Sequence, residues 1–293
     1  MFRGAAALLA GSVAIVLFLA EYIFAIWPSL HIVRAWAVLF GCVKYRRLAA
    51  RKRKVAMRRG VKRAAARWYS FWGSHIWCWV CPLLGLKAQA CLPPELMLGA
   101  GQTGRPVVLI SNHQNSLDAL FLLWITHLLG INLTWIAKRE MARIPGVGLL
   151  LRLLDCAFVG RRGDPRDIAR VRKSAIRANQ DGFSYGIFPE GHRRSKQTVN
   201  QRFKYLGEPR SRGFITVCDK LPGYPVLVLT INWSGHGTTM MDAGRLYGAN
   251  VTVTGELFYN VTELQPTALE TWLIERWQEM DARLEIAATA SST

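Results

Sequence analysis

Acidic residues are scarce in this chain of 293 residues, which has 19 Asp and Glu against 38 Lys and Arg and a formal net charge of +19. The imbalance is concentrated between Lys44 and Arg67, where 12 Lys and Arg occur without a single acid. We call residues 44–67 the basic arm. Such arms bind nucleic acid or anionic lipid head groups, and composition alone does not distinguish these partners.

Other features are also missing. No phosphate-binding loop ending in Gly-Lys-Ser/Thr is present, which excludes the P-loop nucleotide site. Cys78 and Cys81 have the spacing of a redox or zinc motif, but no second Cys or His pair completes a metal site. We therefore expect no bound metal and six free thiols. We see no internal repeat, which argues against a solenoid.

An apolar stretch precedes the basic arm. Residues 4–20 are uncharged, and with residues 22–27 they are long enough to cross a hydrocarbon core of about 30 Å. A cleaved signal peptide is the alternative, but apolar residues continue past Glu21, which favours a retained anchor. By the positive-inside rule the basic arm would keep the following domain cytoplasmic. We expect an integral protein of the bacterial inner membrane or an equivalent membrane, in contact with its phospholipids.

The chain divides into four expected parts. Residues 1–43 form a membrane-anchoring segment and 44–67 the basic arm. Residues 68–94 are rich in Trp and are expected to be helices at the membrane interface, although a plain core helix is an equally good interpretation. Residues 95–293 would form the catalytic domain.

Strand and helix patterns alternate in that domain, which favours an α/β fold with a layered mixed sheet flanked by helices, preceded by the membrane-anchoring helical segment. The expected strands are 106–110, 133–137, 157–159, 185–188, 225–232 and 251–257. The expected helices are 117–129, 146–154, 165–179, 212–220 and 268–286. Asp164 followed by Pro165 gives the third of these a clear start.

The segment Asn112-His-Gln-Asn-Ser-Leu-Asp118 joins an expected strand to an expected helix. A turn there can bring Asp118 against the ring of His113. The carboxylate would fix the tautomer and leave the other ring nitrogen free as a base. The alternative is a turn histidine beside a helix cap, and for an isolated motif that alternative is favoured.

Two further blocks favour the catalytic interpretation of His113 and Asp118 over the alternative of a turn histidine beside a helix cap. Phe158-Val-Gly-Arg161 and Phe188-Pro-Glu-Gly-His-Arg193 follow the first block in order. The three blocks together, within about residues 95–235, resemble the lysophosphatidic acid (1-acylglycerol-3-phosphate) acyltransferase family of glycerolipid acyltransferases. Asp155 and Arg194 depart from the family pattern, which often has Gly and Ser at these positions.

The resemblance implies roles for the block residues. Arg161 and Arg193 would hold the phosphate of the acceptor. Glu190 would be buried near them and would position Arg193 or bind the glycerol, and Gly191 would let the backbone approach the substrate. Lys138, a cation at an expected strand end, is a weaker candidate, because a surface charge explains it equally well.

The expected reaction follows from His113. The neutral imidazole would deprotonate a substrate hydroxyl, which would attack an acyl thioester directly, with no acyl-enzyme and no cofactor. The acyl donor would be acyl-CoA or acyl carrier protein, and the acceptor lysophosphatidic acid. The alternatives are another lysophospholipid, such as lysophosphatidylglycerol, or a non-catalytic protein that binds nucleic acid or anionic membranes through the basic arm. With the three blocks present, we expect no nucleic acid partner.

Overall fold

The computed structural model describes residues 13, 16–17, 20–21, 25–45, 48–96, 104–115, 117–160, 164–191, 202–234 and 247–290. The segment 4–20, expected to anchor the protein, lies almost wholly outside these residues. Arg161 and Arg193 also lie outside them.

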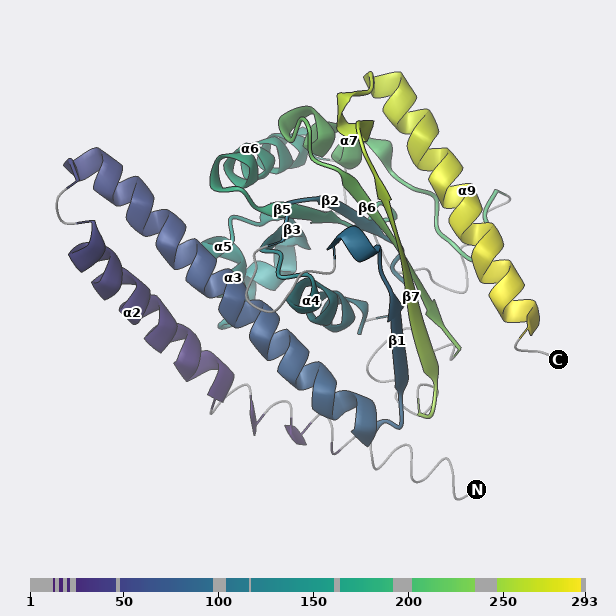
Figure 1. The fold of residues 1–293 in the computed structure, drawn as a ribbon, viewed down its shortest axis with the longest axis horizontal. Helices are drawn as coiled ribbons and strands as arrows, with labels where there is room; N and C mark the ends of the chain where they lie inside the picture. Colours follow the sequence, from purple (N-terminus) through teal and green to yellow (C-terminus); the bar gives the residue numbers. More distant parts are fainter. Residues whose placement is uncertain are drawn as a thin grey trace.

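A seven-stranded mixed sheet forms the centre of the molecule, in the order β1-β7-β6-β2-β5-β3-β4 (Figure 1). All neighbouring strands are parallel except β6 and β7, which are antiparallel. The strands are β1 (Lys87–Cys91), β2 (Val108–Ser111), β3 (Leu133–Lys138), β4 (Ala157–Val159), β5 (Ser184–Ile187), β6 (Val226–Trp233) and β7 (Asn250–Phe258). The layered mixed α/β sheet expected from the sequence is therefore confirmed.

The parallel arrangement places the carboxyl ends of β2, β3, β4, β5 and β6 at one edge of the sheet. β2 is the middle strand, with β5 on one side and β6 on the other. All four of its residues are buried, as are the four residues of β5. Ligands of open α/β sheets bind outside the carboxyl ends of the strands. A binding site is therefore expected at this edge, next to the carboxyl ends of the central strands.

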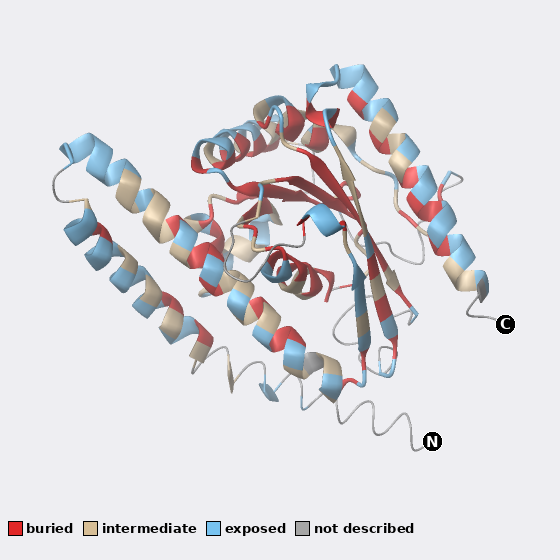
Figure 2. Cartoon of the chain, viewed as in Figure 1, coloured by how far each residue is buried: buried red, intermediate tan, exposed pale blue. Residues whose placement is uncertain are grey.

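Helices cover both faces of the sheet. α3, α4 and α5 lie on one side, and α6, α7 and α9 lie on the other (Figure 1). Figure 2 shows that the central strands and the inward faces of these helices are buried, while the outward faces of the helices and the edge strand β1 are mostly exposed. The helices are α2 (Trp27–Lys44), α3 (Ala50–Leu83), α4 (Asp118–Leu128), α5 (Val147–Leu153), α6 (Pro165–Asp181), α7 (Ser211–Lys220) and α9 (Pro266–Ala290), with short 3-10 turns at η2 (Pro94–Leu96), η3 (Arg139–Arg143) and η5 (Val261–Glu263).

The expected start of α6 is confirmed. The Asp164 side chain accepts a hydrogen bond from the backbone N–H of Arg166 at 2.9 Å, and Pro165 is the first helical residue. A carboxylate at this position satisfies an N–H that has no partner within the helix. Gly182, at φ 69°, ends the helix in the left-handed conformation, which glycine adopts without strain.

The expected boundary near residue 95 is corrected by β1. Lys87–Cys91 lie within the stretch expected to be helical, yet they form a strand that pairs in parallel with β7. β1 is an edge strand and its residues are mostly exposed. Its sequence, Lys-Ala-Gln-Ala-Cys, alternates polar residues with small alanines over only a few positions, which is too weak a pattern to identify a strand. The first strand of the sheet therefore begins at Lys87, 8 residues before the expected start of the domain at residue 95.

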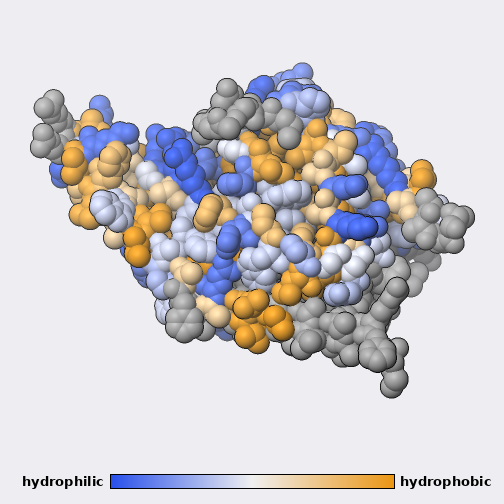
Figure 3. All heavy atoms as spheres, turned by 60° about the horizontal axis from the view of Figure 1, so that its bottom comes forward, coloured by the Kyte–Doolittle hydropathy of each residue, from blue (hydrophilic) through white to orange (hydrophobic). Residues whose placement is uncertain are grey.

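α2 and α3 pack together as a helical hairpin at one side of the molecule. No helix among the described residues is both long enough and apolar enough to span a membrane. α2 nevertheless exposes large apolar side chains, and Figure 3 shows hydrophobic atoms on the surface that α2 forms at the left. We call this set of residues the α2 surface; it comprises Trp27, Ile32, Trp36, Leu39, Phe40 and Val43.

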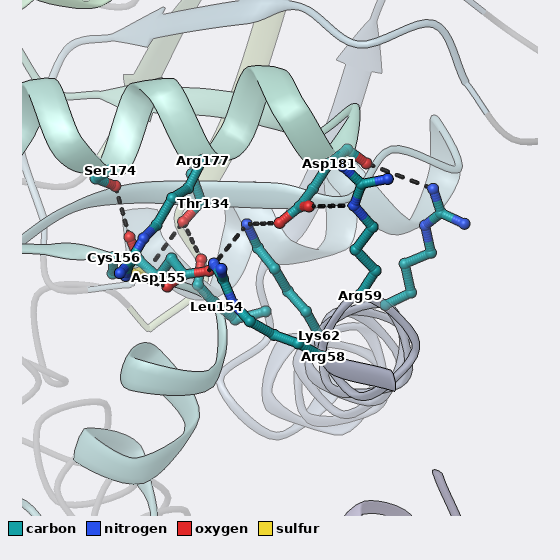
Figure 4. Close-up of polar contacts among 11 residues, drawn as sticks. Arg58, Arg59, Lys62, Thr134, Leu154, Asp155, Cys156, Ser174, Arg177 and Asp181 are labelled. Atoms are coloured by element: carbon teal, nitrogen blue, oxygen red, sulfur yellow. Dashed lines mark hydrogen bonds and ion pairs between the residues drawn. The ribbon is translucent and has the colours of Figure 1, made fainter. Parts of the chain in front are cut away.

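The basic arm continues without a break into the Trp-rich stretch, because residues 50–83 form the single helix α3. Part of the arm binds the catalytic domain instead of facing solvent (Figure 4). Lys62, 1% exposed, lies 3.1 Å from an Asp181 oxygen and 3.4 Å from an Asp155 oxygen. Arg58 pairs with Asp155 at 2.6 Å and Arg59 with Asp181 at 2.9 Å. These cations hold α3 against the ends of α5 and α6.

Candidate functional site

The turn between β2 and α4 brings His113 and Asp118 together. His113 Nδ1 lies 3.0 Å from Asp118 Oδ2. The Asp118 side chain is fully buried, whereas the His113 side chain remains 21% exposed. The pair predicted from the His-x4-Asp spacing is therefore formed, because the turn folds the first residue of α4 back towards the end of β2.

Asp118 has the donors that a buried carboxylate requires. Oδ2 accepts the backbone N–H groups of Gln114 at 2.7 Å and of Asn115 at 2.8 Å, in addition to facing His113. Oδ1 accepts the indole N–H of Trp233, at the end of β6, at 2.8 Å. Burying a charge without such partners is very costly, and hydrogen bonds to a carboxylate favour its ionised form. These donors stabilise Asp118 as an anion.

The anion determines what His113 can do. A carboxylate beside Nδ1 favours the tautomer with the proton on that nitrogen, which leaves Nε2 as an acceptor. The imidazole also stacks on the Phe188 ring, with centroids 4.4 Å apart and planes inclined by 25°. The ring is therefore fixed from one edge and one face. A partly exposed neutral imidazole held in this way is suited to take a proton from a hydroxyl group.

Glu190 connects the third block to the first. It is 1% exposed, and its Oε1 accepts the backbone N–H of His113 at 3.0 Å. Its Oε2 accepts the backbone N–H of Gly207 at 2.9 Å. The burial expected from the sequence is present. The carboxylate supports the backbone that carries the histidine, which is a role in addition to the two that the resemblance implies.

The other predicted site residues differ in position. Gly191 has φ 70° in the turn after β5, a conformation that favours glycine. Lys138 ends β3 at the same edge of the sheet, 45% exposed and 3.5 Å from Glu140. Arg161 and Arg193 lie outside the described residues. Gly160, the residue before Arg161, is at the carboxyl end of β4 and donates its N–H to Asp167 Oδ2 at 2.7 Å.

Sequence reasoning assigned no role to Trp233 or to the side chain of Asn112. Asn112 is fully buried, and its amide makes two hydrogen bonds to the backbone of Ile231 on β6, at 2.7 and 2.8 Å. Nothing in the sequence around Trp233 connects it with Asp118, 115 positions earlier. Asn112 does lie inside the first block, which was the available signal.

Two possible nucleophiles are excluded by their surroundings. Gly182-Phe-Ser-Tyr-Gly186 has the spacing of a serine nucleophile elbow, but Ser184 is buried at the start of β5, at the opposite edge from His113. Its Oγ accepts the Val107 N–H at 3.0 Å. Burial raises the pKa of the Cys156 thiol to about 11, which disfavours the reactive thiolate.

Among the described residues no group of three His, Cys, Asp or Glu side chains is placed to hold a metal ion.

Residues 97–232 match the family described as Acyltransferase. This segment is an acyltransferase domain. Over 143 residues the chain is 32% identical to the human 1-acyl-sn-glycerol-3-phosphate acyltransferase beta, covering 49% of this chain and 46% of that protein. Over 87 residues it is 33% identical to the 1-acyl-sn-glycerol-3-phosphate acyltransferase of Borreliella burgdorferi, covering 30% of this chain and 33% of that protein. The resemblance inferred from the three blocks is confirmed.

The fold agrees with these similarities. The solved 1-acyl-sn-glycerophosphate acyltransferase PlsC of Thermotoga maritima superposes with a TM-score of 0.50 and 18% sequence identity, covering 88% of this chain and 96% of that structure. At this identity the likeness concerns the fold. The chain spans less than half the length of the curated relatives above.

Proposed function

We propose that the protein transfers a fatty acyl chain from acyl-CoA or acyl carrier protein to the free glycerol hydroxyl of lysophosphatidic acid. The observation that carries this proposal is the pair of His113 and Asp118, with Nδ1 against a buried carboxylate and Nε2 left to accept a proton. The acyltransferase domain around the pair, and the names of its relatives, support the choice of reaction.

The chemistry is a direct transfer. His113 Nε2 takes the proton of the glycerol hydroxyl as its oxygen attacks the thioester carbonyl. The new C–O ester bond forms, the C–S bond breaks, and the imidazolium returns the proton to the departing thiolate. Asp118 stabilises the imidazolium between these steps. The acceptor oxygen is itself the nucleophile, so no residue of the chain carries the acyl group.

We assign acceptor recognition to the cations of the second and third blocks and to Lys138. Arg161 and Arg193 would bind the phosphate, because a guanidinium offers two parallel donors that match phosphate oxygens. Lys138 would add a further positive charge there. Support comes from strand order, since β4 and β5, which precede these arginines, end at the same edge as β2.

We further propose that the protein works at a membrane, with the catalytic domain on the cytoplasmic side. The α2 surface exposes Trp and Phe, which favour the boundary between head groups and acyl chains. The cations Arg51, Lys52, Arg53 and Lys54 lie at the start of α3 and are exposed. They would attract anionic head groups of the same bilayer.

His113→Ala tests the reaction. Turnover of lysophosphatidic acid should fall by about 10²- to 10⁴-fold, the range usual for positioned proton transfer, while the variant stays folded. Thin-layer analysis of products from a panel of lysolipids identifies the acceptor, since a preference for lysophosphatidylglycerol would replace lysophosphatidic acid in the proposal. Near wild-type turnover by folded His113→Ala would contradict the proposal.

The non-catalytic alternative is tested on the exposed part of the basic arm. Replacing Arg51, Lys52, Arg53 and Lys54 by Gln removes four charges without disturbing the ion pairs of Arg58, Arg59 and Lys62. An acyltransferase should keep its turnover in detergent. A protein whose function is to bind nucleic acid or anionic membranes through the arm would lose that binding, and the wild type would show no transfer.

A further inference from the structure

Trp233 is the donor to the oxygen of Asp118 that faces away from His113. The indole Nε1 lies 2.8 Å from Asp118 Oδ1, and both residues are buried, Trp233 at 7% and Asp118 at 0% exposure. The other oxygen, Oδ2, meets His113 Nδ1 and two backbone N–H groups. Rotation of the carboxylate about its Cβ–Cγ bond moves both oxygens, so the Trp233 hydrogen bond restrains this rotation from the Oδ1 side, opposite the contacts that hold Oδ2.

The position of Trp233 is itself fixed by two further contacts. Asn112 holds β6 at Ile231, two residues before Trp233, through both the N–H and the C=O of that residue. The Trp233 ring packs edge-on against Trp77 of α3, with centroids 6.4 Å apart. The residue preceding the catalytic histidine thus sets the position of the strand end that carries Trp233.

We infer that Trp233 is a positioning residue for the reaction, holding Asp118 so that Oδ2 faces His113 Nδ1. It acts through Asp118 and touches no substrate. The end of β6 is then a third segment that forms the site, in addition to the turn after β2 and the turn after β5. This inference rests on the proposed function, in which His113 becomes an imidazolium that Asp118 must stabilise.

Trp233→Phe removes the N–H and keeps an aromatic ring. We expect kcat to fall by about 10- to 100-fold, the factor that corresponds to losing a hydrogen bond to a charged group. The KM values for both substrates should stay nearly constant, because the interaction matters for the imidazolium and not for binding. Trp68→Phe is the matched control. It removes an equivalent indole bond, to Ser29 Oγ at 2.9 Å between α3 and α2, and should leave kcat in detergent unchanged.

A double-mutant cycle separates positioning from general stability. In an Asp118→Ala background Trp233 has no carboxylate to hold, so Trp233→Phe should cause no further loss of the residual turnover. Additive losses would overturn the inference, as would a kcat for Trp233→Phe equal to that of Trp68→Phe. If Trp233→Phe does not fold, 3-benzothienylalanine at position 233 keeps the shape of the ring system and removes the N–H. Failure of the proposed function is recognised separately, because wild type and His113→Ala would then be equally inactive.

Discussion

At the residue scale, one set of hydrogen bonds links three strands around His113. Glu190, after β5, binds the backbone of the histidine, and Asp118, at the start of α4, binds its ring. Asn112 and Trp233 connect the same turn to β6. Each of these side chains is buried, and each polar group has a partner that a substitution would leave unsatisfied. The geometry of His113 therefore depends on four buried side chains from three different segments of the chain.

Gly207 gives a test of the support from Glu190. A Cβ at this position would lie 2.8 Å from Glu190 Oε2, too close for either group to stay in place. We expect Gly207→Ala to displace Glu190, to shift the His113 backbone, and to lower kcat by about tenfold or more, since small displacements of catalytic groups are costly. Gly213→Ala in α7, where the added Cβ has ordinary contact at 3.5 Å, is the control and should keep full activity. Equal activity of the two variants would show that Glu190 does not transmit its position to the site.

Arg193 tests the phosphate assignment. Arg193→Lys retains the charge but loses the forked pair of donors, so the KM for lysophosphatidic acid should rise by about tenfold while the KM for acyl donor changes little. Initial rates with each substrate varied in turn measure both constants. Equal changes in the two constants would assign Arg193 to the donor or to the fold.

How much of this site was predictable depends on distance along the chain. His113 and Asp118 lie five positions apart on a turn between a strand and a helix, so their contact was predictable from local structure. Trp233 and Gly207 come from distant segments, and only the folded sheet brings them to the turn. The pair proposed to react can be identified from the sequence, while the residues proposed to orient it depend on tertiary structure.

At the element scale, six strands and five helices of the catalytic domain were predicted within a few residues, because buried parallel strands are nearly continuous apolar runs. β1 was missed for the opposite reason, because it is short, mostly exposed and has no large apolar residue. The basic arm was predicted as a charged segment for an external partner. The spacing of apolar residues in the arm did not reveal that Lys62 faces inward, because such spacing identifies a buried helix face only where that face is apolar.

Asp155 explains part of that inward docking. Its φ of 56° is left-handed, the conformation in which glycine is most often found and which is consistent with the glycine that the family pattern often has here. Its carboxylate pairs with Arg58 and Lys62 of α3 and with Arg177 of α6. Burial by itself would raise the pKa of Asp155, but the hydrogen bond from Arg58 and the charges of Lys62 and Arg177 outweigh burial and hold the pKa below its usual 3.8.

This lowered pKa predicts how stability changes with pH. A carboxyl group with a folded pKa below its unfolded pKa stabilises the fold above the unfolded value, and this contribution is lost as the pH falls through the folded value. Asp155→Asn, which tolerates the same φ, should lower the free energy of unfolding by about 1.5–3 kcal/mol at pH 7. The difference from wild type should shrink below pH ~4.

Denaturant titration across pH measures this difference. Asp219→Asn is the control, because Asp219 is exposed and pairs with its sequence neighbour Lys220. Its effect at pH 7 should be within about 0.5 kcal/mol. A pH-independent cost for Asp155→Asn would mean that packing, and not the charge of Asp155, holds α3 in place.

At the scale of the whole molecule, the ion pairs of α3 connect the α2 surface to the edge of the sheet where β4 and β5 begin, opposite the edge that carries His113. α2 packs on α3, and α3 is fixed to α5 and α6 through Lys62, Arg58 and Arg59. A bilayer bound by α2 would therefore have a defined orientation relative to His113. A lysophospholipid acceptor resides in such a bilayer, so this orientation would govern access to the acceptor.

The α2 surface predicts that turnover depends on whether the substrate is presented in lipid vesicles or in detergent micelles. Trp36 and Phe40 are 69% and 65% exposed, and replacing both by Glu removes two apolar anchors and adds charge that anionic lipids repel. Each buried aromatic side chain contributes about 1.5–3 kcal/mol to membrane partition, so turnover on phosphatidylglycerol vesicles containing lysophosphatidic acid should fall by about tenfold or more. In detergent micelles the double variant should match wild type, because the catalytic residues are unchanged.

Ile286→Glu on α9, where the side chain is 68% exposed, is the control and should keep its activity on vesicles. If the double variant is as active on vesicles as Ile286→Glu, the α2 surface does not bind the bilayer, and the exposed aromatic residues serve another contact.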